Sequence, residues 1–269
     1  MSRFFFQSNF LRKIGYKILN IYSQFNFDLK KNKVFVNSIP KAGTHLVKNI
    51  LIDHLLYFDS YKHIDDNMIN YGDNKIISLD KFKINNKKLL KILKSVKEGQ
   101  VITAHLPFNK TILNSLIKNK FKIIYIKRDV EDQLISRLFY IKGLKRHFLH
   151  NSLMKNFKDD KSRIEALING FKFNENQKID SVNTILKNFK GWQKSNLVHT
   201  VNFEDLAINA NKSRKIKSIK ELIKYLKLDI KEINILKLIK NLKNTKSFTF
   251  RKGKKGEGKK ILKKIYNKN

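Results

Sequence analysis

Residues 33–46 have the sequence KVFVNSIPKAGTHL, which predicts a β-strand, a short loop and the beginning of a helix. The strand is expected over residues 33–38, where β-prone residues alternate. Pro40 ends it, because proline has no N–H group to donate to a neighbouring strand. Apolar residues with helical spacing then predict a helix over residues 45–57.

The loop between this strand and this helix has the residue types of an anion-binding site. A loop that runs into a helix presents backbone N–H groups and the positive end of the helix dipole. Lys41 adds a full positive charge, Gly43 permits close approach of the backbone, and the hydroxyl of Thr44 can donate a hydrogen bond. We therefore expect a site for a phosphate or sulfate group, and the alternative is an ordinary strand-to-helix turn.

The loop is not a Walker A motif, which requires GxxxxGK followed by serine or threonine. A near-match occurs at residues 253–259, but Lys260 stands where the hydroxyl that holds Mg²⁺ would be. The sequence therefore argues against a nucleotide site of that class.

Two further segments place polar residues at the ends of predicted strands. The segment GQVITAHLPF (residues 99–108) ends a short strand at His105, and histidine is the usual base for a hydroxyl near neutral pH. The segment FKIIYIKRDVEDQLIS (residues 121–136) reads as a buried strand followed by a helix. Arg128 at the strand end and Ser136 two turns into the helix could face the same phosphate group.

A late segment, FTFRKGKKGEGK (residues 248–259), carries Arg251, Lys252 and Gly253. Together with PKAGTHL, HLP and the Arg128–Ser136 pair, it resembles the cofactor-binding motifs of the sulfotransferases that use 3′-phosphoadenosine 5′-phosphosulfate (PAPS). The motifs occur in the order of that family, and the resemblance spans about residues 33 to 260.

The resemblance implies that His105 and Lys41 are catalytic and that no metal is required. The implied cofactor-binding residues are Lys41, Ala42, Gly43, Thr44, His45, Leu46, Arg128, Ser136, Arg251, Lys252 and Gly253. It implies that PAPS is the co-substrate and adenosine 3′,5′-bisphosphate (PAP) the product. The sulfuryl group would pass to a hydroxyl or amine of a small-molecule, lipid or glycan acceptor. The alternatives are a nucleotide-dependent kinase and a non-enzymatic binder of nucleic acid or another polyanion, on a related α/β fold.

The chain departs from the family pattern at five positions: Thr103 replaces a lysine, Val130 a proline, Phe203 a tyrosine, Glu257 an aspartate and Gly258 a tryptophan. The sequence leaves open whether the departures at Thr103 and Gly258 reduce activity. Trp192 and the segment 197–206 resemble core scaffold of the family.

The order of elements predicts an α/β fold, P-loop-like, with three α/β/α layers and a central parallel sheet flanked by helices. The remaining predicted strands cover residues 100–104, 121–127 and 197–203, and the remaining helices cover residues 8–24, 87–97, 110–118, 130–142, 180–194, 213–227 and 231–242. The expected division is an amphipathic helical segment (1–30), a sulfotransferase domain (31–260) and a basic tail (261–269). The polar segments 59–86 and 143–178 are expected to form the acceptor pocket.

Composition limits the class of protein. A chain of 269 residues with 41% apolar residues can bury a substantial core. The absence of cysteine excludes disulfides and thiolate chemistry, and it is consistent with a cytoplasmic location. The formal charge of +36 indicates an anionic partner, but the lysines are scattered along the chain, which favours a compositional bias over a specific nucleic-acid partner.

The N-terminal residues 1–30 are aromatic and basic, with apolar residues on one helical face. The segment lacks the apolar region of a signal peptide and is too polar to span a bilayer. Two interpretations remain: the helix docks on the domain, or it lies in a membrane interface as a peripheral contact.

Overall fold

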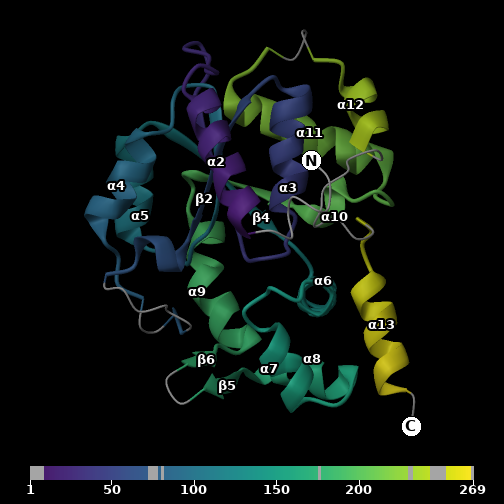
Figure 1. The fold of residues 1–269 in the computed structure, drawn as a ribbon. Helices are drawn as coiled ribbons and strands as arrows, with labels where there is room; N and C mark the ends of the chain where they lie inside the picture. The colour runs from purple at the N-terminus through teal and green to yellow at the C-terminus, as the bar shows by residue number, and fades with distance from the viewer. Residues whose placement is uncertain are drawn as a thin grey trace.

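The computed structural model describes residues 9–71, 78–79, 82–174, 177–229, 233–242 and 253–267. Within them, five parallel strands form a sheet in the order β2-β3-β1-β4-β7 (Figure 1). The strands are β1 (Lys33–Ser38), β2 (Phe58–Asp65), β3 (Gln100–His105), β4 (Phe121–Lys127) and β7 (Val198–Asn202). Val34, Phe35 and Val36 of the central strand β1 are fully buried. A parallel sheet covered on both faces needs such continuous apolar strands.

Helices cover both faces of the sheet. One face packs against α3 (Thr44–Asn49), α11 (Lys212–Leu226) and α12 (Ile235–Asn241), and α3 continues as a π-helical turn, Ile50–His54. The other face packs against α4 (Asn86–Lys94), α5 (Lys110–Lys118) and α9 (Val182–Lys194). Trp192 of α9 is fully buried on this side. The predicted three-layer α/β/α arrangement is therefore confirmed.

The sequence did not predict one strand of the central sheet or the two short strands β5 (Phe171–Asn174) and β6 (Gln177–Ile179). Strand β2 lies inside the segment 59–86, which we expected to be a polar insertion, and it forms an edge of the central sheet. Its sequence does not alternate clearly, because one of its buried positions is Ser60. The Ser60 hydroxyl donates to the carbonyl of Val101 at 2.7 Å, so a polar residue satisfies a core position.

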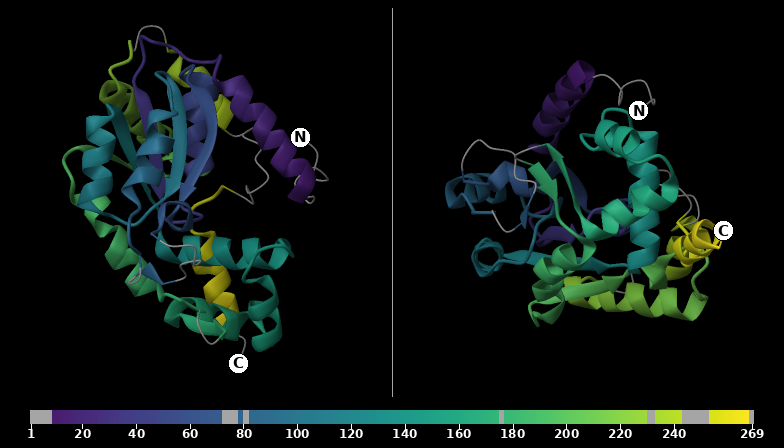
Figure 2. Two further views of the ribbon diagram at one scale, coloured as in Figure 1. Left: turned by 60° about the vertical axis from the view of Figure 1, so that its left-hand side comes forward. Right: turned by 90° about the horizontal axis from the view of Figure 1, so that it is seen from below.

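A helical lobe lies below the carboxyl ends of the strands (Figures 1 and 2). It contains α6 (Val130–Gly143), α7 (His150–Asn156), α8 (Asp160–Asn169), the hairpin β5 (Phe171–Asn174) and β6 (Gln177–Ile179), and α13 (Glu257–Tyr266). These elements share a third apolar cluster. The segment 143–178 is therefore regular over much of its length, and the predicted boundary at residue 260 falls inside α13.

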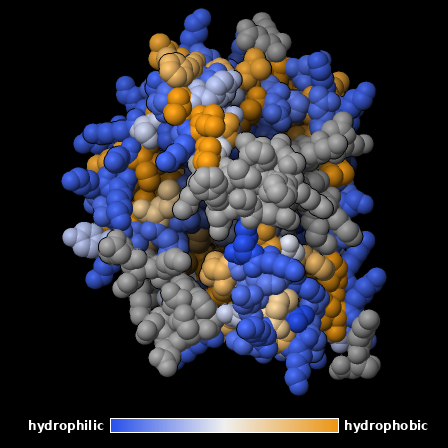
Figure 3. Space-filling model, viewed as in Figure 1, coloured by the Kyte–Doolittle hydropathy of each residue, from blue (hydrophilic) through white to orange (hydrophobic). Residues whose placement is uncertain are grey.

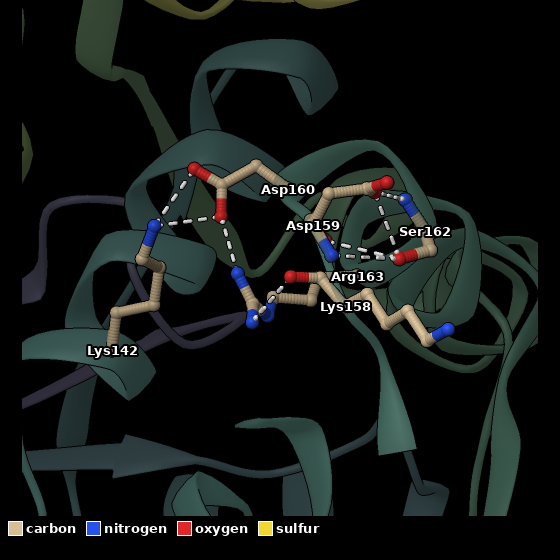
Figure 4. Close-up of polar contacts among 6 residues, drawn as sticks. All are labelled: Lys142, Lys158, Asp159, Asp160, Ser162 and Arg163. Carbon is tan, nitrogen blue, oxygen red and sulfur yellow. Dashed lines mark hydrogen bonds and ion pairs between the residues drawn. The ribbon is translucent and has the colours of Figure 1, made fainter. Parts of the chain in front are cut away.

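The start of α8 is fastened to the end of α6 by a group of polar contacts (Figure 4). Asp159 caps α8 by accepting from the backbone N–H of Ser162 at 2.8 Å. Asp160 accepts from Lys142 Nζ of α6 at 2.6 Å and from Arg163 at 3.0 Å. The cap satisfies an N–H group at the helix start, and the shared carboxylate holds the two helices together.

Helix α13 docks on the start of α6 through one buried carboxylate. Asp132, 2% exposed, accepts from the backbone N–H of Gly256 at 2.6 Å and from that of Gly258. A Cβ atom at residue 258 would collide with the backbone of Glu131 and Asp132. Glycine at this position, where the family pattern has tryptophan, is therefore what lets the two helix starts approach.

This contact generates a stability prediction. Gly258→Ala should lower the free energy of unfolding by about 1–3 kcal/mol, because the obstructing atoms are backbone and the docked helix must shift. Denaturant unfolding measures the change. Gly143→Ala is the matched control, since a Cβ there meets nothing within 4 Å. Equal stability of the two variants would contradict the docking contact.

Candidate active site

The loop after β1 is held by side chains from the start of α6 and the end of β4. The carbonyl of Lys41 accepts from Nη1 of Arg128 at 2.9 Å. The carbonyl of Pro40 accepts from Nε2 of Gln133 at 2.8 Å. The sequence predicted Arg128 as a phosphate ligand but did not predict either contact. These bonds join the loop to the segment that carries the other predicted phosphate-binding residues.

The backbone of the loop fits an anion. Gly43 precedes α3 with φ of 114°, a conformation that favours glycine, and a Cβ there would collide with the ring of Phe203. Within the described part of the chain, the N–H groups of Gly43, Thr44 and His45 make no hydrogen bond. They lie at the start of a helix, where an anion can satisfy them.

Not every predicted loop residue can use its side chain. Ala42 and Leu46 are 1% and 8% exposed and belong to the core, so only their backbone could meet a ligand. The hydroxyl of Thr44 lies 2.6 Å from the hydroxyl of Ser38 in a buried pair. The buried hydroxyl of Thr44 therefore stabilises the loop.

The position and tautomer of His105 follow from one hydrogen bond. Its Nδ1 lies 2.8 Å from the carbonyl oxygen of Ser38, and a carbonyl can only accept. Nδ1 therefore carries the proton, and Nε2 of the neutral ring keeps its lone pair. Burial, the neighbouring His63 and Lys41 lower the pKa of His105 to about 3, although its bond to Ser38 acts in the opposite direction. The ring is thus a neutral base.

Arg128 is positioned by an aromatic ring as well as by the loop. Its guanidinium carbon lies 4.1 Å from the centroid of the Phe203 ring. The same ring faces Gly43, so Phe203 supports both the arginine and the loop. We had interpreted Phe203 only as scaffold.

An aromatic group from the helical lobe reaches Lys41. Its Nζ lies 4.3 Å from the centroid of the Tyr140 ring. His147 lies edge-on to Tyr140, with centroids 5.5 Å apart, and stacks on Phe148 at 4.8 Å. His147 and Phe148, from the segment expected to form the acceptor pocket, therefore lie beside the tyrosine ring that faces Lys41.

Two further histidines lie near His105. His63 of β2 has its ring centroid 4.7 Å from that of His105, and its Nδ1 lies 2.9 Å from the hydroxyl of Thr103. Burial, then Lys48, His105 and Lys41, lower the pKa of His45 to about 4. His45 and His63 are both exposed to solvent. Sequence reasoning missed His63 because it missed strand β2.

The structure describes only some of the remaining predicted cofactor-binding residues. The carbonyl of Gly253 accepts from the backbone N–H of Ile208 at 2.9 Å, which joins the late segment to the loop after the short helix α10 (Phe203–Leu206). Ser136 lies half-buried on α6. Arg251 and Lys252 lie outside the described residues, and their role stays a prediction.

The described residues contain neither a cluster of metal-binding side chains nor a membrane-spanning helix. In them, no group of three or more His, Asp or Glu side chains could hold a metal ion. No described helix is long and apolar enough to cross a membrane.

The environment of His105 predicts its titration. Since its pKa is lowered to about 3 from 6.5, its ring should stay neutral between about pH 5 and pH 8. The unfolded chain takes up this proton near 6.5, so the contribution to stability is present above that pH and decreases as the pH falls toward 3. Imidazole NMR titration measures this, with the resonance assigned by its loss in His105→Gln. A titration midpoint at or above pH 6.5 in the folded protein would contradict the lowered pKa of His105.

The chain is similar to known sulfotransferases in sequence and in fold. The family model described as sulfotransferase domain matches residues 31–267. The amine sulfotransferase of Oryctolagus cuniculus is 27% identical over 133 residues, which cover 49% of this chain and 40% of that relative. The chain is thus matched to less than half of the relative's length.

Solved structures share the fold. The crystal structure of mouse sulfotransferase SULT7A1 complexed with PAP has a TM-score of 0.53 at 18% identity, over 90% of this chain and 82% of that chain. Retinol dehydratase in a complex with retinol and PAP has a TM-score of 0.53 at 15% identity, over 94% and 83%. Because the family model covers most of its length, the chain belongs to the sulfotransferase domain family.

Proposed function

We propose that this protein is a PAPS-dependent sulfotransferase, which moves the sulfuryl group from PAPS to a hydroxyl or amine of a small-molecule, lipid or glycan acceptor and leaves PAP. One observation carries the proposal. The Lys41 loop follows β1, His105 ends the neighbouring strand β3 and Arg128 follows β4, and hydrogen bonds join His105 to the end of β1 and Arg128 to the loop. Open α/β sheets bind ligands at such carboxyl ends. The two solved relatives named above were crystallised with PAP.

The residues of the loop fit the 5′ end of such a ligand. The N–H groups of Gly43, Thr44 and His45 and the charge of Lys41 can donate to its phosphate and sulfuryl oxygens. Arg128 has a planar fork suited to phosphate, and one of its nitrogens already holds the loop. The fork is thus placed to bind a 3′-phosphate next to the loop.

His105 handles the proton of the acceptor. When bound, PAPS supplies a sulfuryl group attached to a phosphate leaving group. Nε2 of His105 takes up the acceptor's proton as the acceptor oxygen or nitrogen bonds to sulfur. Lys41 and the loop N–H groups stabilise the charge that grows on the phosphate oxygen as its bond to sulfur breaks.

The acceptor pocket is proposed on the side of Tyr140, His147 and Phe148. Phe148 is 63% exposed, an unusual position for a large apolar ring and one that an apolar acceptor would cover. The name of the rabbit relative supports including amines among the acceptors.

Two substitutions test the function together. His105→Ala should reduce sulfuryl transfer by at least about 10²-fold, because the base is lost, while PAP binding stays within about twofold. Arg128→Ala should weaken PAP binding and shrink the preference for PAP over adenosine 5′-phosphate. Calorimetric titration and transfer from labelled PAPS to a panel of acceptors measure both. Failure of the unaltered protein to bind PAP would refute the proposal.

A peripheral membrane contact through residues 1–30 is part of the proposal, and the cytoplasmic location stays a prediction. On α2 (Asn9–Ser23), the exposed fractions of Ile18 and Ile21 are 61% and 64%, and Phe25 just beyond is 79% exposed. Figure 3 shows apolar residues gathered over α2 among hydrophilic ones. An apolar helix face on a protein of formal charge +36 suits an anionic lipid surface.

The double variant Ile18→Asp, Ile21→Asp should bind anionic vesicles at least about tenfold less tightly, since burying each isoleucine is worth about 1.5–3 kcal/mol. Co-sedimentation with phosphatidylserine-containing vesicles measures this. Ile117→Asp on α5, at a residue 42% exposed, is the matched control. Equal binding of all three proteins would exclude the membrane contact.

A further inference from the structure

Strand β2 delivers His63 to the site through an irregularity in the sheet. Its pairing with β3 changes register between Asp59 and His63, and Tyr61 between them has φ of 54°. The carboxylate of Asp59 accepts from the backbone N–H of Tyr61 at 2.8 Å and so holds this conformation. Bulges next to active sites commonly redirect a side chain, and a positive φ on a tyrosine costs free energy. The strained geometry places His63 opposite Thr103.

The hydroxyl of Thr103 decides which nitrogen of His63 carries a proton. Thr103 is 6% exposed, and its hydroxyl lies 2.9 Å from Nδ1 of His63. Among the described residues, this is the hydrogen bond that the hydroxyl makes. A buried hydroxyl that does not donate leaves its proton unsatisfied, so donation to Nδ1 is favoured. Nδ1 is then the acceptor and Nε2 carries the N–H.

The two imidazoles at the site therefore have opposite tautomers. The Ser38 carbonyl gives His105 a lone pair on Nε2, whereas the Thr103 hydroxyl gives His63 a proton on Nε2. Their ring centroids are 4.7 Å apart at an interplanar angle of 70°. A group small enough to touch His105 Nε2 is thus within reach of the edge of His63, which is solvent-accessible.

We propose that His63 is a further catalytic residue, whose Nε2–H donates to an oxygen of the transferring sulfuryl group while Thr103 holds its Nδ1. The inference rests on the proposed function and names a donor that the sequence motifs do not contain. A neutral donor suits this position, because a second cation beside His105 would oppose its protonation. His63 forms no covalent bond, and no proton leaves it.

Binding and turnover test this role separately. PAP lacks the sulfuryl group, so His63→Ala should bind PAP within about twofold of the unaltered protein but bind PAPS about 10–150-fold less tightly, the size expected for a donor to a charged group. Its kcat should fall about 10²-fold, as on removal of a preorganised donor to a developing anion. His63→Gln, which keeps an N–H donor, should recover part of both losses.

Thr103→Val provides the second variant, because it preserves the shape and removes only the hydroxyl. It should cause smaller losses in the same direction, and in the His63→Ala background it should cause no further loss, since Thr103 acts through His63. Nitrogen-15 NMR should find His63 with a protonated Nε2 in the unaltered protein and a mixture of tautomers in Thr103→Val. His54→Ala, at the other end of the helix that begins at Thr44, is the matched control and should change none of these quantities.

The outcomes separate the two proposals. If the unaltered protein binds neither PAP nor PAPS, the proposed function fails, and this inference with it. If it binds both and transfers the sulfuryl group, but His63→Ala keeps its PAPS affinity and kcat, only the role of His63 is refuted. Equal effects of Thr103→Val with and without His63 would likewise refute the pairing of the two residues.

Discussion

The candidate site depends on backbone carbonyl groups at the end of β1 and in the loop that follows, which accept hydrogen bonds from side chains brought by other elements. The donors are His105 at the end of β3, Arg128 after β4 and Gln133 on the helix that follows. These bonds fix the end of β1 and its loop, and two of them also orient His105 and Arg128, which have proposed chemical roles. The register of three parallel strands sets these distances, so the sheet positions the chemistry directly.

Hydrogen bonds to neutral groups also orient the two histidines of the site. A backbone carbonyl and a threonine hydroxyl select opposite tautomers in rings that nearly touch. Neither selection needs a charged partner, which matters on a chain with such an excess of positive charge. Neutral partners orient the rings without adding a charge beside His105, whose pKa is already lowered by burial, by His63 and by Lys41.

The helical lobe depends on the contact between α13 and α6. Helix α13 returns from the far end of the chain to pack on α6, and the buried Asp132 caps its start. Gly258 replaced an aromatic residue of the family pattern, which left the function of this end in doubt. The close approach of the backbones accounts for the glycine, which allows the two helices to pack.

Local sequence patterns predicted four of the five central strands, the loop after β1 and the places of His105 and Arg128 at strand ends, because continuous apolar strands and loop motifs can be recognised without the fold. The sequence by itself could not determine strand β2, whose core position Ser60 is satisfied by a bond to a neighbouring strand. It therefore could not place His63 beside His105, nor Phe203 beneath Arg128. Only the tertiary structure decided these contacts, because they depend on which strands become neighbours and in what register, and no local pattern encodes either.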